Sequence, residues 1–191
     1  MPSVFNVLGQ DHQEVKRMLS ELEKGPTVTT GASDNHLMLR KKMVEQLIIE
    51  ESKHEALEEM YFWPVVRDRL PDGDHLADTA TDQEQEGKQV LDQLDKLNAD
   101  QPEFEQLVLT FINAGREHIA YEETEVWPPL CGTITEKEAV NIGDKIAAGK
   151  KTAPTRPHPN TPPSPGVLKA AGPAVAAADR VRDAASGRDR D

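Results

Sequence analysis

The fold of this chain is decided by an eleven-residue stretch that occurs twice. The first copy is His54-Glu55-Ala56-Leu57-Glu58-Glu59-Met60-Tyr61-Phe62-Trp63-Pro64, and the second is His118-Ile119-Ala120-Tyr121-Glu122-Glu123-Thr124-Glu125-Val126-Trp127-Pro128. Six of the eleven positions are identical, and the chain's two tryptophans occupy equivalent places. Such self-similarity indicates an internal repeat of one structural unit.

The histidine and glutamate of each copy are spaced to share one helix face. Residues i and i+4 of an α-helix project from the same side, so His54 points with Glu58 and His118 with Glu122. Both pairs continue apolar stripes, which places two imidazoles and two carboxylates inside the protein. Uncompensated buried charge is costly, and a metal ion compensates it. Nitrogen and oxygen donors suit iron or manganese. A single copy would more often be an ordinary core histidine, but two copies predict a metal site.

Apolar periodicity predicts helices around both copies. The expected long helices, with a kink at Pro64 and an end or kink at Pro128, are Val4–Leu22, Asn35–Arg69, His75–Leu97 and about Glu103–Trp127. Thr135 and Glu138 form a capping-box pattern that opens a last short helix, to about Ala148. Aromatic residues make up only 4%, which disfavours an all-β fold. We predict an all-α fold, an antiparallel four-helix bundle with a short extra helix and a Pro/Ala-rich C-terminal tail.

Composition excludes several classes of partner. The 191 residues carry a net charge of −12, which argues against nucleic acid, because phosphate binding needs a basic surface. No run approaches the roughly 18 apolar residues of a membrane span, and the first residues lack the pattern of a signal peptide. The single Cys131 cannot form an internal disulfide, and we expect it to be a small buried residue. We therefore expect a cytoplasmic protein that contacts neither nucleic acid nor membrane.

The composition changes sharply near residue 150. Residues 150–191 have a net charge of +4, which leaves −16 on residues 1–149, and six of the 14 prolines fall within Ala153–Pro165. That proline density predicts an extended spacer, followed by an Ala-rich segment that is either disordered or a marginal helix. We predict a bundle domain over 1–149 and a tail over 150–191 that carries no site. The alternative is a tail that docks an unknown acidic partner or folds back on the acidic core.

A third histidine is in register with the core of the first helix. His12 shares a face with Leu8, Val15 and Leu19, so we expect it to point inward and bind the metal. The alternative is a core histidine hydrogen-bonded to Asp11 or another neighbour. The second glutamates of the two copies, Glu59 and Glu123, lie one step off the inward face. We expect them to be solvated or to orient the ligand histidines.

These residues resemble the hemerythrin-like family, also called the HHE cation-binding domain. The resemblance rests on Asp11-His12 and on the two His-x3-Glu-Glu copies with their Trp-Pro endings, and it covers residues 1 to about 150. The tail and the acidic core are most similar to actinobacterial, especially mycobacterial, members. The family implies two iron ions bridged by oxo or hydroxo groups and by carboxylates. By this resemblance, the metal ligands are expected to include His12, His54, Glu58, His118 and Glu122.

The third helix departs from the family pattern. The family usually places one or two histidines on its inward face, and projection from Val90, Leu94 and Leu97 puts Gln83 and Gly87 there. The nearby carboxylates are Glu84 and Glu86, of which we favour Glu86 as the sixth ligand. The alternative is an open coordination position beside Gly87. One turn past Glu58, Tyr61 is a candidate contact to the metal ligands, or a packed tyrosine.

An iron site with few ligands favours redox chemistry on small molecules. An open position lets the metal activate a bound molecule, whereas a saturated site only stores or stabilises it. The resemblance implies peroxide, nitric oxide and oxygen as possible small-molecule partners. The first hypothesis is a di-iron oxidoreductase that decomposes peroxide, oxidises nitric oxide with peroxide, or both. The alternative is a module that binds or senses oxygen, nitric oxide or iron without turnover.

Overall fold

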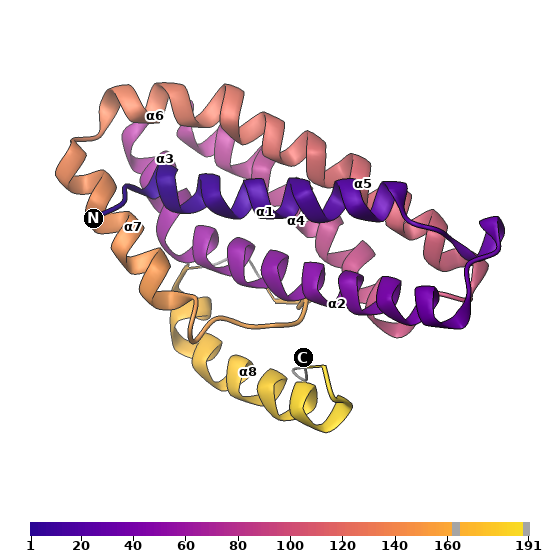
Figure 1. The fold of residues 1–191 in the computed structure, drawn as a ribbon. Helices are drawn as coiled ribbons and strands as arrows, with labels where there is room; N and C mark the ends of the chain where they lie inside the picture. The colour runs from indigo at the N-terminus through magenta and orange to yellow at the C-terminus, as the bar shows by residue number, and fades with distance from the viewer. Residues whose placement is uncertain (162–164, 189–191) are drawn as a thin grey trace.

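The computed structural model describes residues 1–161 and 165–188. Four long helical rods run up and down in sequence and form a bundle (Figure 1). The rods are α1 (Val4–Lys24), α2 (Asp34–Leu57) extended by α3 (Trp63–Arg69), α4 (Gly73–Lys96), and α5 (Pro102–Tyr121) extended by α6 (Trp127–Thr133). Within the described ranges, no helix combines the length and apolar character needed to cross a membrane. The predicted all-α bundle is confirmed.

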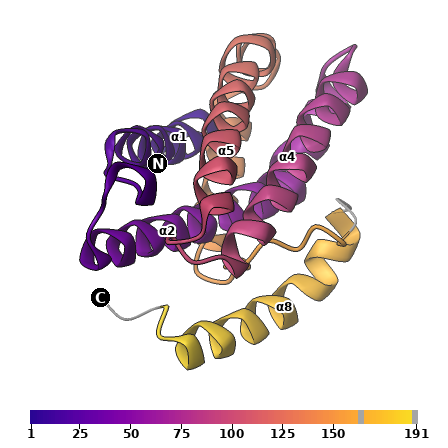
Figure 2. The same ribbon diagram turned by 90° about the vertical axis from the view of Figure 1, so that its right-hand side faces the viewer.

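Around the bundle axis, each rod packs on its neighbours in the chain. Contacts join α1 to α2, α2 to α4, α4 to α5, and α5 back to α1, which closes the four-membered ring seen in Figure 2. Short connections force this antiparallel order. The short helix α7 (Glu136–Gly149) then packs across α1. Its predicted capping box is present, with Thr135 and Glu138 exchanging side-chain and backbone hydrogen bonds.

Both repeat copies change helical pitch at the second half of the motif. After α2 and α5, the backbone makes a π-helical turn, η2 (Glu58–Phe62) and η3 (Glu122–Val126). The backbone N–H of Trp63 donates to the backbone carbonyl of Glu58, and the backbone N–H of Trp127 donates to that of Glu122. Each bond reaches five residues back instead of four. The following proline has no N–H to contribute and would crowd a regular turn. An inserted residue in the π-turn relieves this conflict, so both helices pass through the prolines and extend beyond them.

Two apolar clusters fill the bundle, one toward each end. One gathers residues such as Leu8, Leu57 and Val126, and the other gathers Val15, Ile48 and Leu91. Between them, at the level of His12 on α1, the interior is polar. Cys131 is exposed at the surface of α6, so the expectation that it is buried is wrong.

The tail folds back on the bundle. Helix α8 (Pro165–Ser186) lies outside the bundle and packs against η2 (Figures 1 and 2). Asp95 of α4 accepts hydrogen bonds from Arg156, at 2.7 Å, and from Arg188, at 2.8 Å. Both arginines come from the +4 segment and the aspartate from the −16 segment, so opposite charge joins the two parts. The described part of the tail is thus in contact with its own core.

Candidate metal centre

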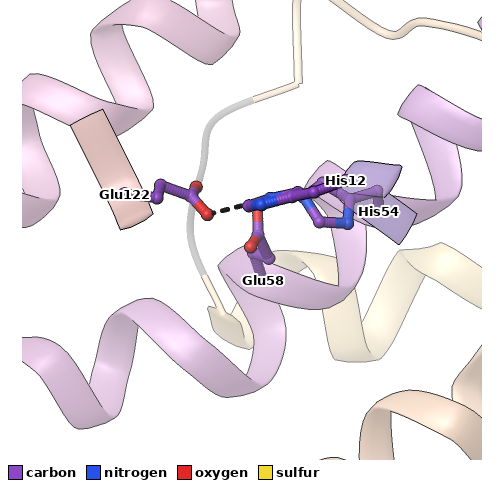
Figure 3. Close-up of side chains that lie close together, drawn as sticks. All are labelled: His12, His54, Glu58 and Glu122. Atoms are coloured by element: carbon purple, nitrogen blue, oxygen red, sulfur yellow. Dashed lines mark ion pairs between the residues drawn. The ribbon is translucent and has the colours of Figure 1, made fainter. Parts of the chain in front are cut away.

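Six buried side chains converge in the polar layer of the bundle. They form two groups of four, whose potential ligand atoms lie within 4.8 Å of one another in each group. The first group is His12, His54, Glu58 and Glu122, which Figure 3 shows pointing toward one another from three rods. The second group is Glu58, Glu84, His118 and Glu122. Glu58 and Glu122 belong to both groups, so each has a carboxylate placed to face two metal positions.

The sixth side chain in the cluster is Glu84, whereas the sequence favoured Glu86. The structure brings together the other five residues named from the sequence, but Glu86 is exposed on the outer face of α4 and lies outside both groups. Glu84 is 2% exposed, and its Oε1 accepts a 2.5 Å hydrogen bond from the Trp63 indole N–H. The indole therefore fixes the rotamer that presents Glu84 to the centre.

The donor atoms of this cluster face one another: His12 Nε2 lies 3.3 Å from Glu122 Oε2, His54 Nε2 lies 3.2 Å from Glu58 Oε2, and His118 Nε2 lies 3.1 Å from Glu122 Oε1. Among the described residues, these three Nε2 atoms have no hydrogen-bond partner outside the cluster. The same is true of both carboxylate oxygens of Glu58 and of Glu122, and of Glu84 Oε2. Buried polar atoms are nearly always satisfied, so this concentration of unsatisfied atoms at one place requires an explanation. A cation bound among imidazole nitrogens and carboxylate oxygens satisfies them all.

Each histidine is oriented by a hydrogen bond on its other ring nitrogen. The Nδ1–H groups of His12, His54 and His118 donate to Glu123 Oε1 at 3.0 Å, Asp11 Oδ2 at 3.4 Å and Gln83 Oε1 at 3.1 Å. These acceptors require a proton on Nδ1, which leaves the Nε2 lone pair free for a metal. Lys16 and Lys150 hold the Glu123 and Asp11 carboxylates in turn.

Sequence reasoning found only part of this outer layer. Glu123 does orient a ligand histidine, as one of its two expected roles. Asp11 binds His54 instead of the adjacent His12, and Gln83, to which no role was given, holds His118. Glu59 is buried and bound to Lys88, so it is neither solvated nor a histidine partner. Tyr61 is half-buried on η2, and its contact with the clustered side chains stays a prediction.

The two tryptophans of the repeat support the centre in different ways. Trp63 donates to Glu84, whereas the Trp127 ring stacks on His12 with ring centroids 4.9 Å apart and planes inclined by 12°. The stacked indole restricts rotation of the His12 ring. One repeated residue thus positions a carboxylate on α4, and its counterpart positions an imidazole on α1.

The pKa values of the cluster reflect competition between burial and opposite charge. Burial lowers the pKa of His118, but the Glu122 and Glu58 carboxylates outweigh it and raise that pKa to about 9. The pKa of His54 is likewise raised, against burial, by Glu58 and Asp11. Burial raises the pKa of Glu58, and Glu122 adds to the effect. Burial also acts to raise the pKa of Glu122, but His118 and His12 outweigh it and lower that pKa. Without metal, protons therefore occupy the donor atoms, and a metal must displace them.

Comparison with known proteins agrees with this geometry. A family model described as the hemerythrin HHE cation-binding domain matches residues 3–130, which include both copies of the repeat and all six clustered side chains. The chain belongs to the hemerythrin HHE cation-binding family. Membership of this family implies that the protein binds a metal, iron. Within the described residues, the His/Glu cluster is the place that can hold it.

Two individual proteins extend the hemerythrin comparison. An uncharacterized hemerythrin-like protein of Schizosaccharomyces pombe is 27% identical over 184 residues, covering 96% of this chain and 86% of that protein. A hemerythrin HHE cation-binding domain-containing protein of Mycobacterium kansasii has a crystal structure similar to this fold, with a TM-score of 0.63 and 21% identity. The likeness covers 79% of this chain and 86% of that one. It supports the bundle architecture.

Proposed function

We propose that this hemerythrin-family chain is a di-iron oxidoreductase acting on small oxidants, with hydrogen peroxide as the principal substrate. The observation that supports it most is the ligand set itself. Each metal position is offered four protein side chains, two of them shared carboxylates. Six-coordinate iron would keep positions for a bridging oxygen and for an exchangeable small molecule.

The balance of donors favours turnover over reversible oxygen carriage. One position is offered two histidines and two glutamates, and the other one histidine and three glutamates. On α4, where histidines are usual in the family, stand Gln83 and Gly87. An oxygen carrier keeps its irons rich in histidine, so that oxygen leaves as oxygen. A carboxylate-rich pair resembles the di-iron carboxylate bundles, whose ligands come from facing helices in the same way.

The proposed reaction converts two molecules of hydrogen peroxide into two of water and one of oxygen. Bridged iron would supply the reversible exchange of two electrons that this requires. The chain's own residues hold the geometry: Gln83, Asp11 and Glu123 fix the imidazoles, and Trp63 fixes Glu84. The apolar clusters on both sides exclude bulk water. Peroxide could also oxidise nitric oxide, two molecules with one peroxide giving two of nitrous acid.

Iron content and gas evolution test the proposal together. Protein expressed in iron-replete medium is expected to contain about two irons per chain and to release oxygen from hydrogen peroxide. His118→Ala is expected to lose both iron and activity. His75→Ala is the matched control, because His75 is exposed on α4 and away from the cluster. Nitric oxide consumption is measured with and without peroxide in the same samples.

An iron-loaded protein that neither evolves oxygen nor consumes nitric oxide would refute the enzymatic proposal. It would leave the alternative, an iron, oxygen or nitric oxide binding or sensing module. Activity that survives unchanged in His118→Ala would place the chemistry outside this cluster.

A further inference from the structure

A small cavity lies between the bundle and the tail, beside the metal centre. Its volume is about 40 Å³. At roughly 10–15 Å³ for each water, this is room for about three water molecules. The bundle side is lined by Ser52, Glu55, Glu59 and Lys88, and the tail side includes Pro157, His158 and Val175. We call this space the tail cavity. None of the six clustered side chains lines it directly.

Two buried polar groups on the cavity wall have no hydrogen-bond partner in the described part of the chain. They are Ser52 Oγ, on a residue 5% exposed, and Glu55 Oε2, on a residue 3% exposed. Both belong to α2 and both residues line the tail cavity. Buried polar atoms are ordinarily satisfied by protein or by small polar molecules. Ser52 Oγ, together with Glu55 Oε2 whose charged neighbour Lys88 Nζ lies 3.7 Å away, can therefore hydrogen-bond a small molecule in the cavity.

Lys88 lines the tail cavity and also lies next to one of the six clustered side chains. Lys88 Nζ lies 3.7 Å from Glu55 Oε2 and 3.8 Å from Glu84 Oε2, and it is also paired with Glu59. The next residue back, Gly87, has no side chain to thicken this wall. A Cβ added there would meet Phe111 at 3.6 Å and the Glu55 carboxylate at 3.8 Å. Glu55, Lys88 and Glu84 thus connect the cavity to the cluster by successive contacts.

The outer wall is held in place by buried contacts of the tail. Thr155 Oγ1 donates to Asp183 at 2.5 Å, and His158 Nε2 lies 2.9 Å from Asp179; both aspartates are fully buried. Asp95 of α4 anchors the same segment through Arg156. The tail therefore forms the outer wall of the cavity.

We propose that the tail cavity is the entrance to the metal centre and that the tail limits what passes to small polar molecules of about three heavy atoms or fewer. The size limit follows from the volume, and Ser52, Glu55 and Lys88 place polar atoms on a wall that is otherwise mostly apolar. Hydrogen peroxide and azide fit this class, whereas tert-butyl hydroperoxide does not. The inference rests on the proposed function only where it names peroxide as the substrate, because entry of azide is independent of turnover.

The experiment measures azide binding to the iron-loaded full-length chain by stopped-flow absorbance. Val175→Phe places a larger side chain at the cavity from α8, far in sequence from every ligand. It is expected to slow association and dissociation of azide alike, by about tenfold or more, with iron content and equilibrium affinity unchanged. Val181→Phe is the matched control, because Val181 lies on the same helix and is 71% exposed. The control is expected to bind azide at the wild-type rate.

A second variant acts in the opposite direction. Asp95→Asn removes the charge that holds Arg156 and Arg188, so it is expected to loosen the tail, speed azide entry and permit turnover of tert-butyl hydroperoxide. If both variants retain iron and bind azide at the wild-type rate, the proposal that the tail cavity is the entrance is refuted. If Val175→Phe fails to hold iron, the Asp95→Asn rate decides alone. If gating of azide is found but no variant turns over peroxide, the entrance stands and the proposed function fails.

Discussion

Glu84→Gln tests whether α4 supplies one metal ligand, and to which of the two metal positions. Glu84 belongs to the group with Glu58, His118 and Glu122, but not to the group with His12 and His54. The substitution takes the first of these groups from four protein ligands to three and leaves the other intact. We therefore expect selective loss of one iron, from about two per chain to about one.

The size of the effect follows from what the substitution preserves. In the metal-free protein, burial raises the pKa of Glu84 well above its ordinary value, because it disfavours the charged carboxylate. Glutamine has the same shape and carries no charge to bury, and its carbonyl still accepts from the Trp63 indole. Metal-free stability should change by less than about 1 kcal/mol. Loss of a ligand should exceed the 10–100-fold effect of losing a supporting contact, so we expect about 100-fold weaker binding at that position, about 2.7 kcal/mol.

The assay is iron per chain by atomic emission, followed by competition with a chelator and by thermal unfolding of the metal-free protein. Glu86→Gln is the control, since Glu86 is exposed two residues away on the same helix, and it should retain about two irons. The reasoning is refuted if Glu84→Gln keeps both irons at wild-type affinity, or if Glu86→Gln loses iron.

Three further outcomes are expected. Gln83→Ala removes the acceptor that holds His118, so iron affinity measured by chelator competition should fall by about 10–100-fold. Gln89 is exposed on the same helix, so Gln89→Ala should leave iron affinity unchanged. Equal iron affinity in the two variants would contradict the orienting role of Gln83. The metal-free protein should lose thermal stability as the pH rises from 6.5 to 9. The pKa of His118 is raised to about 9 in the folded protein, so protonated His118 stabilises the fold fully below pH 6.5, and this stabilisation is lost as the imidazolium loses its proton. The raised pKa of Glu55, about 8, acts in the same direction, since burial disfavours its charged form. Circular dichroism melts with and without iron check this, and a metal-free protein that is more stable at pH 9 would show the sign to be wrong. Finally, Arg40→Met breaks a buried pair with Glu105, joined by two 2.6 Å hydrogen bonds, and should cost about 3–5 kcal/mol in urea unfolding. Arg17→Met, whose partners Glu14 and Glu21 are exposed, should cost less than about 1 kcal/mol, and similar losses in the two variants would refute the distinction.

The sequence alone identified five of the six clustered side chains, which lie on strongly patterned helices. The i and i+4 spacing in the two copies places His and Glu together whatever the tertiary contacts are, since backbone geometry alone decides it. His12 follows from its register with large apolar residues on α1. The bundle is determined for the same reason, because amphipathic helices joined by short connections have few other ways to bury their apolar faces.

Tertiary structure decided the phase of α4. Projection from Val90, Leu94 and Leu97 put Gln83 and Gly87 inward and favoured Glu86. Gly87 and Leu94 are buried as projected, but Val90 and Leu97 are only half-buried. The other buried residues of the helix are Gly73, Ala77, Ala80, Glu84, Lys88 and Leu91. Alanine and glycine are small and glutamate is polar, so the pattern of large apolar residues in the sequence did not indicate the inward face of this helix. Glu84 is placed in the cluster by contacts with other helices: the Trp63 indole of the neighbouring rod donates to it, and it lies beside Glu58, His118 and Glu122.

The π-turns and the docked tail were also decided beyond local sequence. Pro64 and Pro128 indicated a disturbance in each helix, but whether a helix kinks, ends or inserts a residue depends on what packs around it. The charges of the tail made docking on the core possible, but opposite net charge specifies no partner. Asp95 is one of many acidic residues, and only the folded arrangement of α4 brings it between Arg156 and Arg188. The sequence fixes which side chains share a helix face, and packing between helices decides which faces meet.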